Sequence, residues 1–508
     1  MPLKPAEIPI SLAAAATAVV LAVSACSAED GIDGVDGGAA GAGALAGTAG
    51  TGGTPSAGGA LGAGAPGGNA GASAGGTSAA GGAGAPAGGA APLPATCAEA
   101  AAGYVIEKTA LDPALTPPAA MGGGNRSALQ LPVAADATST FVGLTRAEGG
   151  VNASVVAIVG GATITTPGAV TGGVVATKDG VAILLFDPNA ATGERTWAAV
   201  RRVRLDGTQI FQTDLFRSAN LTDEDTKGAP EGGRLGYLAA TDQVVAYFGH
   251  TQRYDDGVRH QGGYLATLDA SGAQTVLNGW FGSHNLDRRL LVGDAAASVI
   301  GLGDAYPEGI FFSVLGARPQ PVVLYPLAAA GNGATNGQLG GMVDVGSEIL
   351  LPFITNRSVP QDLDAGTWPD IDDTISQQIR DAAGNGTDVG LLRLPKSEMN
   401  PRMALTATWL EVARPEGVRL ERLKSARYGA GSLTLLAWAE ASGSGRQAAL
   451  SYFTMVIDPS GAVCQPKTAL PADAAFTAAD DIVRRPDGSI VWASPVAAGL
   501  QLVTLRPR

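Results

Sequence analysis

One arrangement of short apolar runs and turns recurs through the last four fifths of the chain. A first strand-like run leads through a tight turn to a strongly apolar run, a polar loop, a third run and a second turn. Two copies of this pattern begin GGVVATKDGVAILLF and RLGYLAATDQVVAYF. Short runs with alternating hydrophobicity and Asp-Gly turns predict antiparallel strands. Amphipathic helical periodicity is almost absent, so we expect an all-β fold.

The recurrence predicts a ring of similar sheets. Repeats of roughly 40–60 residues with four strands each are typical of a β-propeller. We therefore predict a seven-bladed β-propeller over residues 95–508. Six or eight blades remain alternatives because the first and fifth units are irregular, and two packed β-sandwiches would share the same alternation. The predicted first strands begin near Arg126, Gly173, Leu235, Arg288, Leu339, Arg422 and Asp480.

The two ends of this region predict how the ring closes. The last unit stops after its third strand, whereas residues 103–108 form an isolated strand-like run. That run would supply the missing outer strand and protect the open edge. Cys97 precedes it, and Cys464 begins the outer strand of the preceding unit. Two cysteines in an exported domain favour a disulfide, so we expect a Cys97–Cys464 bond that locks the ring.

The N-terminus carries the features of an export signal. Residues 8–23 are apolar or small, and the run is too short to span a membrane. The sequence Val23-Ser24-Ala25-Cys26 then resembles the lipobox of bacterial lipoproteins. That resemblance implies a signal peptide over residues 1–25, a lipid on Cys26 and, with Ser27 in place of Asp, attachment to the outer membrane. The domain would then face the periplasm or the cell exterior. An ordinary secretory signal is the alternative.

Residues 26–94 are almost entirely Gly, Ala, Ser, Thr and Pro. Such a composition cannot build a core, so we predict a disordered Gly/Ala-rich linker with a root-mean-square span of about 40–50 Å. The net charge is −13 and basic runs are absent, which argues against nucleic-acid binding. The nucleophile elbow, the P-loop and the dinucleotide fingerprint are absent too. We expect a monomer whose membrane contact is made by its N-terminal lipid.

All three histidines fall within one 35-residue stretch. In the predicted blade, the loop between the second and third strands and the connection to the next blade emerge on one face. The histidines would therefore share that face, and the acidic insert of the fifth unit, residues 355–388, would lie on it as well. The candidate ligand or metal residues are His250, His260, His284 and Asp304. Supporting polar groups are Arg253, Asp255, Asp256, Arg259, Gln261, Asp287 and Tyr306.

Three chemistries remain open for this cluster. Imidazoles with a carboxylate suit a divalent metal such as zinc, manganese or copper. The same groups without metal suit acid–base catalysis, with an arginine neutralising a carboxylate substrate. Alternatively, the histidines only hydrogen-bond loops.

Function is open in the same way. We favour a lipid-anchored envelope propeller that binds a polysaccharide or protein ligand. A polysaccharide-active enzyme is the first alternative, by analogy with lyases in which His and Tyr act on a uronic-acid ring. A purely structural envelope lipoprotein is the second. Whether the chain is an enzyme stays undecided.

Overall fold

The computed structural model describes the repeated region almost throughout. The described residues are 93–112, 115, 130–148, 151–186, 197–217, 233–253, 259–283, 285–293, 296–304, 308–315, 322–325, 327, 329–331, 334–335, 337–356, 386–398, 405–442, 449–497 and 499–508. The predicted signal peptide, Cys26 and the linker up to residue 92 lie outside them. Within the described residues, no helix is long and apolar enough to cross a membrane.

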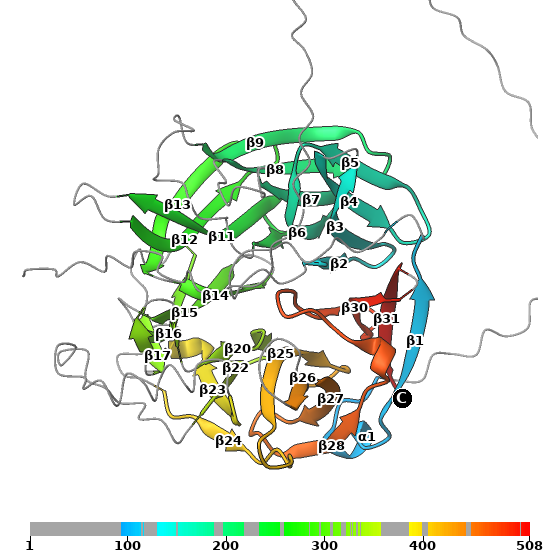
Figure 1. Cartoon of the computed structure of the whole chain (residues 1–508), viewed down its shortest axis with the longest axis vertical. Helices are drawn as coiled ribbons and strands as arrows, with labels where there is room; N and C mark the ends of the chain where they lie inside the picture. The colour runs from blue at the N-terminus through cyan, green and yellow to red at the C-terminus, as the bar shows by residue number, and fades with distance from the viewer. Residues whose placement is uncertain are drawn as a thin grey trace, which may run out of the picture. The chain divides into compact units, whose positions relative to one another are not determined.

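Seven antiparallel sheets stand around a common centre, as predicted, so the all-β seven-bladed propeller is confirmed (Figure 1). In each blade, the first strand lies innermost and later strands follow outward. Blade 1 consists of β2 (Val133–Ala135), β3 (Thr140–Glu148), β4 (Val151–Ile158) and β5 (Thr163–Pro167). Blade 2 consists of β6 (Val170–Thr177), β7 (Gly180–Phe186), β8 (Trp197–Arg204) and β9 (Gln209–Arg217). Blade 3 consists of β10 (Arg234–Leu238), β11 (Gln243–Arg253), β12 (Arg259–Leu268) and β13 (Gln274–Ser283).

The remaining blades follow the same order with two irregularities. Blade 4 consists of β14 (Asn285–Val292), β15 (Ala297–Asp304), β16 (Glu308–Val314) and β17 (Val322–Tyr325). Blade 5 has a divided inner strand, and consists of β20 (Gln338–Leu339), β21 (Val343–Asp344), β22 (Glu348–Thr355), β23 (Asp388–Pro395) and β24 (Thr408–Leu410). Blade 6 consists of β25 (Arg419–Tyr428), β26 (Leu433–Ser442), β27 (Ala449–Ile457) and β28 (Val463–Ala469). A small hairpin, β18 (Ala329–Gly331) and β19 (Ala334–Thr335), lies between blades 4 and 5 in the chain.

Blade 7 joins the two ends of the domain. Its strands β29 (Val483–Arg484), β30 (Ile490–Val496) and β31 (Gly499–Pro507) are completed by β1 (Tyr104–Ala110), which pairs antiparallel with β31 over seven residue pairs. Figure 1 shows the blue β1 beside the red C-terminal strands. The short helix α1 (Cys97–Ala100) precedes β1, and Cys97 is bonded to Cys464 on β28. Both parts of the predicted closure, the borrowed strand and the disulfide, are confirmed.

The hydrophobic core is divided among the blade junctions. Each cluster of buried apolar side chains joins two neighbouring blades, including the closing pair of blades 7 and 1. Between blades 2 and 3, for example, Phe186 packs on Phe248, and Phe248 stacks on Tyr264 with ring centroids 5.0 Å apart. Because each blade buries both faces against neighbours, its second strand is apolar throughout, as in residues 180–186.

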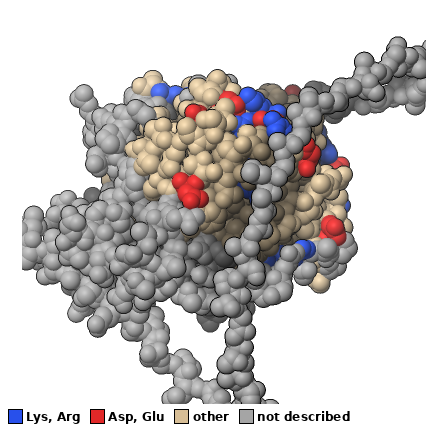
Figure 2. All heavy atoms as spheres, turned by 90° about the horizontal axis from the view of Figure 1, so that it is seen from above, with Lys and Arg blue, Asp and Glu red and all other residues tan. Residues whose placement is uncertain are grey.

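Inner strands run in one direction, so the ring has two distinct faces. We call the face at which the inner strands begin the network face, and the face at which they end the turn face. The predicted starts of six units lie in or within three residues of an inner strand, and the seventh, Arg126, lies outside the described residues. Figure 2 shows small groups of acidic and basic side chains of the described residues, with uncharged surface between the groups.

Candidate functional site

The inner strands of all seven blades surround a central cavity of about 460 Å³. Ligand pockets of a few hundred Å³ with convergent polar groups are the usual form of a small-molecule site. Glycine allows blades 2 and 3 to approach closely at its wall: a Cβ on Gly233 would come within 2.2 Å of Leu184 and within 2.7 Å of the Gly172 carbonyl oxygen. The cavity is built into the ring itself, since every blade contributes to its lining.

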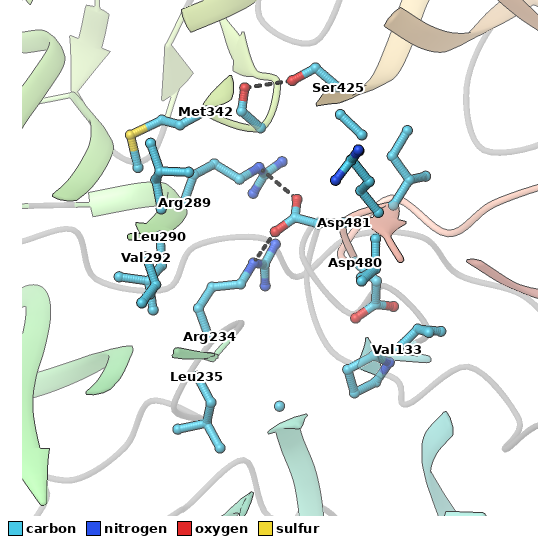
Figure 3. Close-up of a pocket in the computed structure, with 18 of the residues that line it drawn as sticks. Val133, Arg234, Leu235, Arg289, Leu290, Val292, Met342, Ser425, Asp480 and Asp481 are labelled. Carbon is cyan, nitrogen blue, oxygen red and sulfur yellow. Dashed lines mark hydrogen bonds and ion pairs between the residues drawn. The ribbon is translucent and has the colours of Figure 1, made fainter. Parts of the chain in front are cut away.

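Asp481 is the centre of the charged groups at the network face. Its Oδ2 lies 2.8 Å from Nε of Arg234 on blade 3, and its Oδ1 lies 3.1 Å from Nε of Arg289 on blade 4 (Figure 3). The Asp481 side chain is 27% exposed, whereas those of Arg234 and Arg289 are 13% and 4% exposed. One carboxylate of blade 7 thus bridges two guanidinium groups across the ring.

Arg289 is held by a second carboxylate. Asp287 forms an ion pair with its Nη1, and Asp287 Oδ2 accepts a hydrogen bond of 3.1 Å from the Leu339 backbone N–H of blade 5. Arg289 Nη2 donates to the Leu339 carbonyl at 2.9 Å. Asp287, predicted as a supporting residue of the site, therefore lies beside the cavity-lining Arg289 and connects blades 4 and 5.

Blade 7 also reaches blades 1 and 6. Asp480 Oδ2 accepts hydrogen bonds from the Leu131 backbone N–H and from the Thr477 hydroxyl, the latter at 2.7 Å. Lys424 of blade 6, whose side chain is buried, donates from Nζ to the Ala478 carbonyl at 2.7 Å. We call Arg234, Asp287, Arg289, Lys424, Asp480 and Asp481 the channel network. It holds three basic and three acidic groups from four blades.

A β-bulge places Lys424 in this network. Between Glu421 and Lys424, strand β25 gains one residue relative to β26, and Arg422 takes the left-handed backbone with φ 58°. An extra residue reverses which side chains face each side of a strand. The Arg422 backbone N–H is satisfied by Gln338 Oε1 at 2.7 Å, and its Nη1 donates to the Tyr452 hydroxyl at 2.9 Å. The unusual backbone is thus supported by specific partners on both sides.

The pKa values of three groups in the channel network are shifted, and those of its two adjacent aspartates move in opposite directions. Burial raises the pKa of Asp480, against the hydrogen bonds from Leu131 and Thr477. Burial also acts to raise the pKa of Asp481, but Arg234 and Arg289 outweigh it and lower the pKa to about 2. Burial, with the neighbouring Arg289, lowers the pKa of Lys424 to about 7. Two adjacent carboxyl groups in opposite environments are a frequent feature of acid–base sites.

The predicted histidine site is only partly described. The backbones of His250 and His260 lie in β11 and β12, where they pair with Gly262 and Gln252. Both residues therefore belong to paired strands at the network face and not to the connecting loop, and residues 254–258 lie outside the described residues. Nothing is described of their side chains, and His284 lies outside the described residues, as do Asp255, Asp256 and Tyr306.

Backbone positions of the other predicted residues agree with that face. Arg253 pairs with Arg259 at the end of the same hairpin, and Gln261 pairs with Thr251. Asp304 pairs with Glu308 in blade 4, also at the network face. Their side chains are outside the described set. Among the side chains that are described, no group of three or more His, Cys, Asp or Glu residues could hold a metal ion.

We call the paired strands β11 and β12, which carry His250 and His260, the histidine hairpin. It packs against Arg288, the neighbour of the cavity-lining Arg289. The Arg288 side chain is buried, and a Cβ on Gly249, the neighbour of His250, would lie 2.1 Å from Arg288 Nη2. Only glycine leaves room for the guanidinium at that point. The predicted hairpin and the channel network are therefore adjacent parts of one face.

Five residues of the channel network were not predicted as site residues: Arg234, Arg289, Lys424, Asp480 and Asp481. A signal for them was present. Each stands within two residues of a predicted start of an inner strand, where a charged residue interrupts an apolar pattern. Charges at the start of successive inner strands point to the channel once a propeller is assumed.

Comparisons with known proteins identify no family for this chain. No protein-family model matches it, and no curated protein sequence matches it. Among solved structures it is similar to an α-L-arabinofuranosidase from Lactobacillus brevis, with 12% identity, a TM-score of 0.30 and coverage of 56% of this chain and 89% of that one. It is also similar to a Penicillium chrysogenum α-L-arabinanase complexed with arabinobiose, with 9% identity, a TM-score of 0.34 and coverage of 64% of this chain and 89% of that one. A third similar structure is a Pyrococcus horikoshii acylaminoacyl peptidase, with 10% identity, a TM-score of 0.37 and coverage of 74% of this chain and 52% of that one.

Proposed function

We propose that this chain is an exported, lipid-anchored β-propeller that binds a small polar ligand at the network face of its central channel. The observation that carries the proposal is the cavity of about 460 Å³. All seven blades line it, and four residues of the channel network are among the lining residues: Arg234, Arg289, Asp480 and Asp481. Rigid walls and a few convergent charged groups favour a specific ligand of limited size. The histidine hairpin beside Arg288 would contribute further contacts at the same face.

The charges favour a ligand rich in hydroxyl groups that also carries a carboxylate. Carboxylates such as Asp481 and Asp287 accept hydrogen bonds from hydroxyls, and guanidinium groups bind carboxylates through paired N–H donors. With three basic and three acidic groups, the network has little net charge to attract a simple ion. We therefore propose an acidic saccharide unit, of the uronate type, as the ligand class.

Calorimetric titration of the purified protein with galacturonate and glucuronate oligosaccharides, and with neutral glucose oligosaccharides, tests this proposal. We expect saturable binding of the acidic sugars only. Arg289→Gln should weaken it at least 10-fold, because charge-assisted hydrogen bonds contribute about 1.5–3 kcal/mol each. Arg393→Gln, which removes a partly exposed arginine paired with Glu348 on blade 5, is the matched control and should bind normally. Absence of binding across the panel would contradict the proposal.

A second candidate function is an enzyme that cleaves such saccharides. The observation in its favour is the pair Asp480 and Asp481, whose pKa values move in opposite directions. A carboxyl whose pKa is raised, next to one whose pKa is lowered, can supply a general acid and a base. Incubation with acidic polysaccharides, followed by reducing-end and unsaturated-uronate assays, should then show activity that Asp480→Asn abolishes. If the protein binds the saccharide but forms no product, the enzyme proposal is wrong and the binding function stands.

The lipid anchor is tested separately. Val23-Ser24-Ala25-Cys26 and the Gly/Ala-rich linker support attachment of a folded domain at a distance from a membrane. In bacterial cells, Cys26→Ala should move the protein from the membrane fraction to the soluble fraction and prevent incorporation of labelled fatty acid. Equal membrane recovery of both forms would contradict lipidation.

A further inference from the structure

The turn-face end of the channel has a different composition from the network face. Arg427, near the end of β25, and Arg484, at the end of β29, both line the central cavity. They come from neighbouring blades and are each partly buried. Burial, together with the charge of Arg427, lowers the pKa of the Arg484 guanidinium. Two guanidinium groups therefore stand close enough at one end of the cavity to repel each other.

Within the described residues, neither arginine forms an ion pair: no described carboxylate lies within 4.0 Å of either guanidinium. Arg427 Nε donates to the Gly431 carbonyl at 2.8 Å, and Arg484 Nη2 donates to the Gly429 carbonyl at 3.0 Å. These carbonyls belong to one turn and satisfy only part of two five-donor groups. Arg484 Nε is buried and has no hydrogen-bond partner in the structure.

The nearby acids are committed elsewhere. Asp344, which also lines the cavity, is paired with Lys396 at 2.7 Å. Asp487 accepts from the Ser489 backbone and hydroxyl, and it pairs with Arg506 at 3.1 Å. A further basic side chain in this region, Arg485, donates a hydrogen bond to the Thr140 hydroxyl. Asp487 still acts on Arg484 electrostatically and works to raise its pKa, but its ion pair is with Arg506, so the described residues leave an excess of positive charge around Arg427 and Arg484.

From this geometry we infer that Arg427 and Arg484 form a binding site for a small oxyanion, such as phosphate, at the turn-face end of the channel. Two guanidinium forks offer paired N–H donors that match tetrahedral or planar oxyanions. Their position in the cavity wall favours a soluble ion, or an anionic group of a soluble ligand, over a broad anionic surface. The site lies at the opposite end of the channel from the network face, so it does not depend on the ligand proposed there.

The test is a calorimetric titration of the purified protein with inorganic phosphate and sulfate at constant ionic strength, with chloride as the reference salt. We expect saturable binding of the oxyanions and none of chloride. Arg427→Gln and Arg484→Gln should each lower the affinity for phosphate at least 10-fold. Arg393→Gln, the control outside the cavity, should stay within twofold of wild type. Arg427→Lys keeps the charge but loses the fork, so it should show an intermediate affinity.

Fold integrity is checked on the same samples. Circular dichroism should show a native β spectrum for each variant, and if Arg484→Gln does not fold, Arg427→Gln and Arg427→Lys carry the test. The inference is overturned if wild type binds no oxyanion in a saturable way, or if the folded arginine variants bind as well as the Arg393→Gln control.

Discussion

Asp481→Asn is the substitution that tests the channel network most directly. It preserves the shape of the side chain but removes the charge that faces Arg234 and Arg289, whose side chains are 13% and 4% exposed. Two guanidinium groups are then left without their shared carboxylate. Breaking a buried ion pair by removing one partner costs about 3–5 kcal/mol. Because Asp481 itself is 27% exposed, we expect a loss near the lower limit of this range.

The pKa of Asp481 gives a second measure of the same interaction. A shift from 3.8 to about 2 corresponds to about 2 kcal/mol of stabilisation. The folded-state pKa is depressed, so this stabilisation is fully present above about pH 4 and is lost as the pH falls toward 2. Unfolding entropy of about 2.1 cal/mol/K per residue, over roughly 400 residues, converts 2–3 kcal/mol into a decrease in Tm of about 3 °C.

Thermal unfolding followed by circular dichroism between pH 3 and pH 8 measures both effects. The difference in Tm between wild type and Asp481→Asn should be constant from pH 8 to pH 5 and should shrink below about pH 4. Asp344→Asn is the control, since it breaks a pair with Lys396 whose side chains are 41% and 39% exposed; its Tm should change by less than about 1 °C. If Asp481→Asn unfolds at the wild-type temperature, the network does not hold blade 7 as described.

Three further predictions concern stability. The Cys97–Cys464 bond closes 367 residues, so the double variant Cys97→Ser/Cys464→Ser should lose up to about 6 kcal/mol, seen as a Tm lower by several degrees than that of the oxidised protein; an unchanged Tm would contradict the lock. Lys424→Met removes a cation whose pKa is lowered to about 7, which penalises folding below pH 7 and is relieved as the pH rises toward 10.5. In urea unfolding the variant should therefore gain most over wild type at pH 6 and least at pH 10; a constant difference would refute the buried charge. Gly249→Ala places a methyl group against Arg288 and should cost about 1–3 kcal/mol in the same assay, whereas the control Gly293→Ala, where a Cβ meets only the Ala296 carbonyl oxygen at 3.6 Å, should change stability by less than about 1 kcal/mol.

Much of the architecture was predictable because it is encoded locally. The continuous apolar run of residues 180–186 and the Asp-Gly turns act over fewer than ten residues, and their recurrence predicted strands, turns and the blade count. The isolated run at residues 103–108 and the incomplete last unit predicted the closing strand, since an unpaired edge must find a partner. Cys97 and Cys464 followed from the same closure.

The candidate site was predicted less well. Asp287 belongs to the channel network, and the backbones of His250 and His260 lie in the paired strands β11 and β12. The chemistry was placed at the histidines, however, because imidazole is conspicuous in a chain with so few. Arg234 and Asp481 attracted no attention, since a charged residue at the start of a strand is common on protein surfaces. The arginine pair at the turn face gave no local signal at all.

What the sequence alone determined is the repeated unit, its number and the way its ends join, because each of these depends on neighbours along the chain. Only the tertiary structure decided which charges meet. Arg234 and Asp481 are 247 residues apart, and they reach each other only because seven blades close into one ring. A bulge of one residue in β25 then directs Lys424 into the channel network, and the same closure brings Arg427 and Arg484 to one cavity, where no carboxylate of the described residues pairs with them. Ion pairs and their absence depend on distances of a few ångströms in space, which no local pattern of residues records.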